Sequence, residues 1–467
     1  MPALMVQGVS SWAGKSLLTT ALARAFRRRG IDVVPFKAQN MSNNARVVHG
    51  GEIGSAQYLQ ALAAGVEPDV RMNPILVKPE GDNRSQVVVL GKPDLELSRR
   101  GWLERPTSLW PVIKAAMDGL ASEHDLLLLE GAGSPAEINL QATDLANMRT
   151  AHAADAQVML VADINRGGAF AHLYGTWALV NDDDRARLTG FVLNKFRGDP
   201  SLLADGPKQL EELTGVPTLG VLPWLDHGLP DEDGAAPQHV EGGRFAIGIV
   251  RYPTASNQDE FKQLEQVADV SWITDAREIG EADVLILPGS KHLAADLGWL
   301  VHTGIGTAIR QRARRGGRIL AICGGMQMLG ERIDDPAGVD GAAEGLGLLP
   351  IRTTFAALKR TERTTTRFRS LPEPWAMLGG LAICGYEIRH GATTTTGAVA
   401  EALSGSLGFV AGPILGVYLH GLFEQPEVVA AIVGTIPPRS LDQTFDELAD
   451  AIEKHLDLAG LLESIGM

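Results

Sequence analysis

Residues 319–330 read ILAICGGMQMLG, in which a cysteine stands between an apolar run and two glycines. The apolar run predicts a buried strand that ends at Cys323, and MQML predicts a helix after Gly324 and Gly325. Such a turn exposes the side chain before it, and a helix start favours a thiolate. The stretch therefore predicts a cysteine nucleophile, whereas Cys384, in LAICGYEI, is predicted to be a buried structural residue.

A cysteine nucleophile needs a base and donors for an oxyanion. His420 ends the apolar run PILGVYLHG, which predicts that it lies at the same edge of a parallel sheet as Cys323. The stretch LPGS, residues 287–290, ends a third strand pattern. We expect the backbone amides of Gly289 and Gly324 to contribute to an oxyanion hole.

A second motif, GVSSWAGKS at residues 8–16, follows a strand pattern and opens a helical one. It differs from the pattern G-x-x-x-x-G-K-[ST] by one extra residue between the glycines. Loop amides and the helix dipole bind phosphates, Lys15 would neutralise the β and γ phosphates, and the Ser16 hydroxyl would ligate Mg²⁺. The motif predicts ATP and Mg²⁺ binding. Its nucleotide-binding candidates are Gly8, Ser10, Gly14, Lys15 and Ser16.

Carboxylates must complete a magnesium site. Glu130 ends the strand pattern DLLLLEGAG, Asp163 ends AQVMLVADI in the same way, and Glu52 lies in GGEIGSAQ. Position favours Glu130, because the carboxyl ends of parallel strands meet at the phosphate edge; each of the three can also be a solvated or capping carboxylate. Asn194 precedes Lys195 at the end of GFVLNKF, where a side chain can read adenine.

These motifs need a scaffold that brings strand ends together. Near-continuous apolar runs alternate with amphipathic stretches in two series, which predicts two doubly wound α/β domains with mainly parallel sheets. We place an ATP-dependent domain at 1–225 and a second domain at 245–467. Residues 226–244, DHGLPDEDGAAPQHVEGGR, have no periodicity and read as a linker, and 357–370 as a surface hairpin or loop.

Composition excludes several classes. The 467 residues are 45% hydrophobic and carry a net charge of −14, which argues against nucleic acid or an acidic membrane as the main partner. Two cysteines cannot form a disulfide framework, and no stretch is apolar enough to span a membrane or resembles a signal peptide. We therefore expect a cytoplasmic protein.

The extended phosphate loop, the strand ending EGAG and the strand ending Asn194-Lys195 resemble the dethiobiotin synthetase-like P-loop family. This resemblance implies that ATP activates a substrate carboxylate as an acyl phosphate, which an amine then displaces. Such activation makes chemical sense, because a carboxylate is a poor electrophile until one oxygen becomes a leaving group. The protein would mainly position the reactants and neutralise charge.

In this order, LPGS, CGGMQ and YLHG resemble the class I glutamine amidotransferases, which have a flavodoxin-like fold. The resemblance implies that Cys323 attacks the amide of glutamine, forms a thioester and releases ammonia, with Gln327 contacting the glutamine. The usual His-x-Glu is absent, because Leu422 follows His420-Gly421 and Glu424 has the wrong spacing. The chain also resembles the cobyrinic acid amidase type, in which a Cys–His pair suffices; the third triad member stays open.

Four further stretches, 35–45, 50–57, 72–92 and 162–171, resemble the corrinoid amidotransferases of cobalamin biosynthesis. The resemblance implies amidation of the b, d, e and g carboxylates of adenosylcobyrinic acid a,c-diamide, with ATP and glutamine, to give adenosylcobyric acid. Cationic and amide side chains in these stretches are candidates for binding the corrinoid, or ordinary polar surface. They are Lys37, Gln39, Asn40, Asn43, Asn44, Lys78, Arg84 and Arg166.

Three alternatives remain open. The first is a cobyrinic acid a,c-diamide synthase, which shares the two-domain plan and amidates the a and c carboxylates. The second is CTP synthase, whose usual His-x-Glu is missing here. The third is a partitioning-type P-loop ATPase switch with a non-catalytic appended domain, which leaves the Cys323 turn unexplained.

Overall fold

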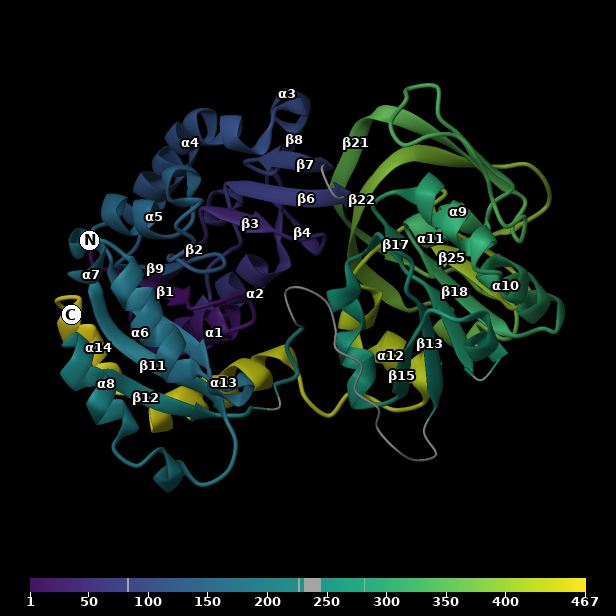
Figure 1. Ribbon diagram of the computed structural model, residues 1–467. Helices are drawn as coiled ribbons and strands as arrows, with labels where there is room; N and C mark the ends of the chain where they lie inside the picture. The colour runs from purple at the N-terminus through teal and green to yellow at the C-terminus, as the bar shows by residue number, and fades with distance from the viewer. Residues whose placement is uncertain (82–83, 226, 231–244, 281) are drawn as a thin grey trace.

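The computed structural model describes residues 1–81, 84–225, 227–230, 245–280 and 282–467. Its chain forms two α/β lobes that lie side by side (Figure 1). The predicted linker lies outside the described residues, apart from 227–230. None of the described helices is long and apolar enough to cross a membrane.

The first lobe is built on a six-stranded parallel sheet in the order β12-β11-β10-β1-β9-β2. Most of its central residues are fully buried, which explains their unbroken apolar patterns. The strands are β1 (Ala3–Gly8), β2 (Val33–Phe36), β9 (Leu126–Glu130), β10 (Gln157–Asp163), β11 (Leu188–Phe196) and β12 (Thr218–Pro223). The longer helices are α1 (Lys15–Arg28), α2 (Ser55–Ala64), α4 (Arg105–Ala121), α6 (Ala169–Leu179) and α8 (Gly206–Thr214).

Two small sheets extend this lobe toward the second one. One contains β3 (Gln39–Met41), β6 (Ile75–Gly81), β7 (Arg84–Val89) and β8 (Lys92–Asp94). The other is an antiparallel pair of β4 (Ala45–Val48) and β5 (Gly51–Gly54). Short helices complete the lobe: α3 (Leu95–Arg99), α5 (Met148–Ala153) and α7 (Asp182–Arg185).

The second lobe has a seven-stranded sheet in the order β15-β13-β16-β18-β25-β24-β23, whose first five strands are parallel. The strands are β13 (Ala246–Val250), β15 (Asp269–Ile273), β16 (Val284–Leu287), β18 (Arg318–Ile322), β23 (Ala400–Leu403), β24 (Gly408–Ala411) and β25 (Ile414–Val417). Its helices are α9 (Leu293–His302), α10 (Ile305–Arg314), α11 (Gly324–Leu329) and α12 (Pro426–Val433). Both lobes thus confirm the predicted doubly wound, mainly parallel α/β fold.

A long hairpin of β21 (Ile351–Arg367) and β22 (Ala382–Thr395) lies at the boundary of the lobes, beside β6 and β7 (Figure 1). Residues 357–370, expected to form a surface hairpin or loop, thus belong mostly to one strand of this longer hairpin. Cys384 lies on β22 between buried neighbours and is itself exposed, so its prediction as a buried residue is wrong. The alternation of a strand turns this side chain away from the core.

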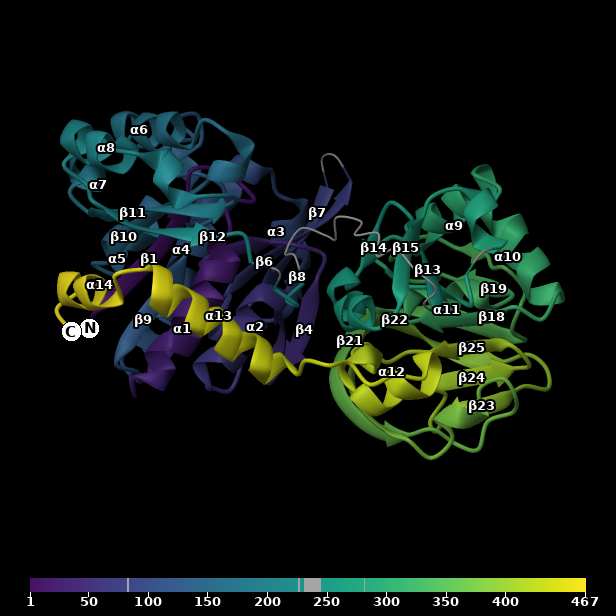
Figure 2. The ribbon, with the colours of Figure 1, turned by 90° about the horizontal axis from the view of Figure 1, so that it is seen from below.

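The C-terminal helices α13 (Leu441–His455) and α14 (Leu458–Ser464) return to the first lobe (Figure 2). Phe445 and Leu448 share an apolar core with Leu18 of α1. Arg24, also on α1, forms an ion pair of 2.7 Å with Asp446. We therefore propose that residues 441–464 belong with the first domain rather than with the second.

Candidate active sites

The phosphate-loop motif connects β1 to α1, as its sequence predicts. Gly14, the residue before α1, has φ 99°, a conformation that favours glycine. The Lys15 ammonium donates hydrogen bonds to the carbonyls of Ser10 (3.1 Å) and Gly133 (3.2 Å). The loop thus curls around the Lys15 side chain at the start of a helix, which is the geometry of a phosphate-binding site.

Glu130 lies at the centre of a buried network beside this loop. The Ser16 hydroxyl donates to its Oε1 at 2.8 Å, and the Lys37 ammonium lies 2.8 Å from the same oxygen. Gln60 donates to Oε2 at 2.5 Å. Ser16 and Glu130 are thus adjacent, as two groups that hold one Mg²⁺ must be. In proteins Mg²⁺ usually has only one or two protein ligands, and phosphate oxygens and water complete its coordination. The described residues contain no cluster of three or more His, Cys, Asp and Glu suited to a metal.

The structure does not bring Glu52 to this site. Its carboxylate is fully buried and lies 2.6 Å from the ammonium of Lys78 and 2.7 Å from that of Lys359. Burial alone would raise the pKa of Glu52, but the two lysines lower it to about 2. Because Lys359 lies on β21, Glu52 forms an ion-pair cluster between the lobes, and the expectation that it ligates magnesium is withdrawn.

Two other strand-end groups are already engaged within the protein. The Asn194 amide donates to the Ala13 carbonyl at 2.9 Å and accepts from the Lys195 amide at 2.8 Å, so it braces the phosphate loop. This leaves it poorly suited to read adenine. The Asp163 carboxylate lies 3.2 Å from the Lys195 ammonium and 3.5 Å from the Arg166 guanidinium.

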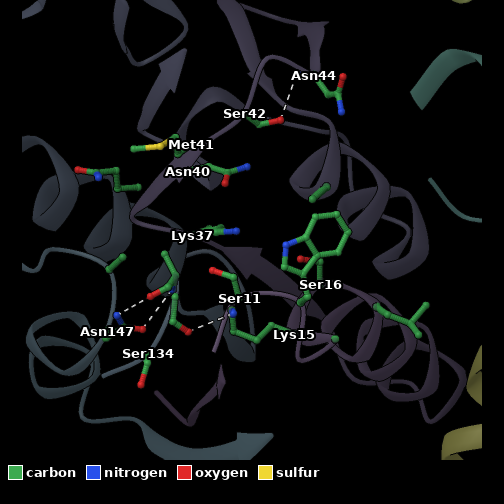
Figure 3. Close-up of a pocket in the computed structure, with 18 of the residues that line it drawn as sticks. Ser11, Lys15, Ser16, Lys37, Asn40, Met41, Ser42, Asn44, Ser134 and Asn147 are labelled. Carbon is green, nitrogen blue, oxygen red and sulfur yellow. Dashed lines mark hydrogen bonds between the residues drawn. The ribbon is translucent and has the colours of Figure 1, made fainter. Parts of the chain in front are cut away.

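A pocket of about 440 Å³ opens in front of the phosphate loop (Figure 3). Lys15 and Ser16 line it together with Ser134 and Asn147 from the loop after β9. Four of the eight corrinoid candidates line the same pocket: Lys37, Gln39, Asn40 and Asn44. The other four do not: Asn43, Lys78, Arg84 and Arg166.

Large apolar side chains that the sequence analysis did not single out also line this pocket. Trp12 and Trp102 are 41% and 39% exposed, and Met41 and Leu140 are exposed beside them. Exposed apolar groups around one pocket indicate a ligand with an apolar face. Nothing in the local pattern around these residues separates them from core positions.

Cys323 occupies the sharp turn between β18 and α11. Its backbone has φ 50° and ψ −109°, an unusual conformation for a non-glycine residue and the one expected of a nucleophile elbow. A Cβ at Gly325 would lie 2.2 Å from the Leu287 carbonyl, so only glycine fits there. The turn therefore depends on the two glycines that follow the cysteine.

His420 follows β25, and its ring is buried beside the thiol. Its Nδ1 lies 2.9 Å from Glu260 Oε1, and the backbone amide of Gly421 donates to Glu260 Oε2 at 3.0 Å. Glu260 belongs to η6 (Gln258–Gln266), 160 residues before the histidine, and is only 1% exposed. Glu260 thus contacts the histidine as the carboxylate of a His-x-Glu motif would. Glu424, the nearest glutamate after His420 in the sequence, pairs instead with Arg46 at 2.9 Å.

The electrostatics of this cluster favour a protonated histidine. Burial would lower the pKa of His420, but the Glu260 carboxylate and the Cys323 sulfur outweigh it and raise the pKa to about 10. An imidazolium at this position stabilises a thiolate, which is the reactive form of cysteine. Cys323, His420 and Glu260 thus have the arrangement of a nucleophile, a base and an orienting carboxylate.

The predicted glutamine-binding groups surround this cluster. Gly289 lies on β17 (Gly289–Ser290), where a Cβ would lie 2.8 Å from His420 Cε1. Gly324 begins α11, and a Cβ there would lie 2.7 Å from the Ser290 amide. Gln327 donates to the His390 carbonyl (3.1 Å) and the Tyr418 hydroxyl (3.3 Å), so its amide is held within the protein.

Comparisons with known proteins agree with this two-site architecture. Residues 4–230 match the family described as CobQ/CobB/MinD/ParA nucleotide binding domain. Residues 246–428 match the CobB/CobQ-like glutamine amidotransferase domain. The fold and the two sites therefore define an ATP-dependent, glutamine-hydrolysing amidating ligase.

Curated relatives narrow this class. The chain is 51% identical to the cobyric acid synthase of Polaromonas sp. (strain JS666 / ATCC BAA-500), over 99% of this chain and 98% of that protein. It is also 51% identical to the cobyric acid synthases of Polaromonas naphthalenivorans (strain CJ2), with 99% of each chain covered, and Variovorax paradoxus (strain S110), with 99% of this chain and 98% of that protein. The chain belongs to the cobyric acid synthase family.

Proposed function

We propose that this protein amidates the b, d, e and g carboxylates of adenosylcobyrinic acid a,c-diamide, giving adenosylcobyric acid, with ATP and glutamine as cosubstrates. The observation that carries the proposal is the presence in one chain of a phosphate-loop pocket and a Cys323–His420–Glu260 cluster. The first suits carboxylate activation and the second suits ammonia production. Membership of the family supports the pairing.

In the first site, Lys15 and the loop amides bind the nucleotide phosphates. Ser16 and Glu130 would hold Mg²⁺, which when bound would neutralise charge at the phosphates. The substrate carboxylate attacks the γ phosphorus, ADP leaves, and an acyl phosphate forms; ammonia then displaces phosphate to give the amide. Lys37, 2.8 Å from Glu130, adds a second positive charge where the transferred phosphoryl group carries negative charge.

In the second site, the Cys323 thiolate attacks the side-chain amide carbon of glutamine. The His420 imidazolium protonates the amide nitrogen, the C–N bond breaks, ammonia leaves and a thioester remains. A water molecule then attacks the thioester, His420 accepts its proton, and glutamate and the thiolate are released. Glu260 keeps the ring oriented and stabilises its positive charge through Nδ1.

The pocket also suits the proposed substrate. A corrinoid has an apolar macrocycle with carboxylates and amides at its periphery. Trp12, Trp102 and Met41 present apolar surface, and Gln39 and Asn40 present amide groups to the same space. This combination supports a corrinoid rather than a small metabolite as the carboxylate substrate.

Mass spectrometry of the products from the a,c-diamide, ATP and glutamine tests the proposal. We expect four successive acid-to-amide exchanges, and ATP hydrolysis that depends on this corrinoid. Conversion of cobyrinic acid itself at its a and c positions, with no reaction of the a,c-diamide, would instead identify an a,c-diamide synthase.

A further inference from the structure

Arg46 crosses from the first lobe into the second. It lies on β4, its side chain is 5% exposed, and its Nη2 lies 2.6 Å from Asp259 Oδ2 and 2.9 Å from Glu424 Oε1. Its Nη1 donates to the Tyr386 hydroxyl at 2.5 Å. These three hydrogen-bond and ion-pair partners all belong to the second lobe.

These partners contact the glutaminase cluster directly. The Tyr386 ring stacks on the His420 ring, with centroids 5.4 Å apart and an interplanar angle of 21°. The backbones of the two residues also exchange hydrogen bonds, of 3.2 and 2.9 Å. Asp259 immediately precedes Glu260, which contacts His420 Nδ1. Arg46 is thus linked to the histidine by two routes, one through Tyr386 and one through η6.

The residues beside Arg46 hold the same part of the second lobe. The Asn44 side-chain oxygen accepts a hydrogen bond from the Gln258 amide at 3.0 Å. The Asn257 side-chain amide donates to the Ala45 carbonyl at 2.7 Å and to the Tyr386 hydroxyl at 2.9 Å. Asn257 has φ 53°, so the start of η6 has a backbone conformation that these contacts stabilise.

The same residues reach the first active site. Asn44 and Asp259 both line the phosphate-loop pocket, together with Lys15. The wall of that pocket therefore includes the neighbour of the carboxylate that orients His420. The contacts of Asn44 and Asp259 thus connect the phosphate-loop pocket, where ammonia would be used, to Glu260, which orients the histidine of the site that would release it.

We propose that Arg46 is a positioning residue of the glutaminase: it holds Tyr386 and η6 so that His420 and Glu260 are aligned, and it makes glutamine hydrolysis depend on the docked first lobe. The inference rests on the proposed function, because it assigns the Cys323 site to glutamine. A buried guanidinium suits this role, since its planar fork holds several acceptors in fixed directions.

Arg46→Met and Arg46→Lys test the proposal in the full chain. We expect Arg46→Met to lower kcat for glutamine hydrolysis about 100-fold, the effect of a misplaced catalytic group, while KM for glutamine stays near the wild-type value. Amidation with added ammonia should persist. Arg46→Lys should be intermediate, since it keeps the charge but loses the fork.

Lys359→Met is the matched control, because it removes another buried ion pair between the lobes, to Glu52, without touching the glutaminase cluster. It should retain wild-type kcat for glutamine hydrolysis. Wild-type kcat in Arg46→Met, or an equal loss in Lys359→Met, would overturn the proposal. A failure of wild-type protein to amidate the corrinoid with ammonia would instead refute the proposed function.

If Arg46→Met does not fold, Arg46→Lys and Tyr386→Phe decide the matter. Tyr386→Phe keeps the ring on His420 and removes the hydroxyl that binds Arg46 and Asn257. We expect a fall in kcat of roughly 10- to 100-fold, because both hydrogen bonds to the hydroxyl are lost, with ammonia-dependent amidation intact. Unchanged kcat in both variants would refute the proposal.

Discussion

Glu260→Gln removes the charge that orients and stabilises His420 while preserving the size of the side chain. In the protein this carboxylate contacts both Nδ1 of the histidine and the Gly421 amide, at 2.9 and 3.0 Å. An amide can still bond to one of these donors, but it cannot stabilise an imidazolium. The variant should therefore fold and lose glutaminase activity.

The size of the expected loss of activity follows from the raised pKa of His420. Glu260 and Cys323 together raise its pKa from 6.5 to about 10; at about 1.4 kcal/mol per unit this corresponds to about 5 kcal/mol in favour of the imidazolium, of which Glu260 supplies a part. Converting the orienting carboxylate of a serine-type triad to an amide lowers kcat about 10⁴-fold. We expect a fall of about 10²- to 10⁴-fold in glutamine hydrolysis by Glu260→Gln.

The assay measures glutamate release and, separately, amidation with added ammonia. Glu265→Gln is a suitable control, because Glu265 lies on the same element and pairs with Lys262 at 2.5 Å. Ammonia-dependent amidation should be unchanged in both variants. Glutamine hydrolysis by Glu260→Gln within a few-fold of wild type would refute the assignment of Glu260 as the third member.

The same pKa shift predicts a pH dependence of stability. Because the folded-state pKa of His420 exceeds that of the unfolded chain, its stabilising contribution is complete below about pH 6.5 and is lost as pH rises toward 10. Wild-type free energy of unfolding should fall through this window, and the fall should be smaller in Glu260→Gln. Denaturant unfolding at pH 6, 8 and 10 measures it; an equal decline in both proteins would contradict the shift.

Three other substitutions test the two sites. Cys323→Ala should abolish glutamine-dependent amidation and leave the ammonia-dependent reaction. The control, Cys384→Ala at an exposed cysteine, should leave both reactions. Loss of both reactions in folded Cys323→Ala would count against separate sites. Lys15→Ala should remove corrinoid-dependent ATP hydrolysis, with exposed Lys114→Ala as the control, and unchanged hydrolysis would refute the phosphate-loop assignment. Leu422→Glu places a carboxylate at a fully buried apolar position, so it should lower the melting temperature without raising the glutaminase rate. A marked gain in rate would show that Glu260 alone does not orient His420 well enough.

Local patterns were enough to predict the scaffold and the strand-end groups. Buried parallel strands leave unbroken apolar runs, and the glycines at Cys323 and in the phosphate loop mark turns that side chains would block. Each of these signals, the apolar run and the glycine turn, is contained within a few consecutive residues. The adjacency of Ser16 and Glu130 follows from the same rule, since both stand at the carboxyl edge of one sheet.

Contacts between distant segments were not predictable in this way. Glu260 reaches His420 from 160 residues upstream, and nothing in QDEF distinguishes it from a solvated carboxylate. Glu52 is a candidate magnesium ligand in the sequence, but its carboxylate pairs with Lys359, which comes from the other lobe. The sequence of α13 predicts an amphipathic helix but does not indicate which lobe its apolar face packs against. Its return to the first lobe is decided by tertiary packing.

The central claim is that nitrogen released at Cys323 is joined to a carboxylate activated in the phosphate-loop pocket. The most direct measurement is mass spectrometry of the corrinoid product made from adenosylcobyrinic acid a,c-diamide, ATP and glutamine labelled with ¹⁵N at its amide. The account predicts four new amides, each carrying the label, and none in Cys323→Ala supplied with glutamine alone. An unchanged corrinoid, or labelled amides formed by Cys323→Ala, would contradict it.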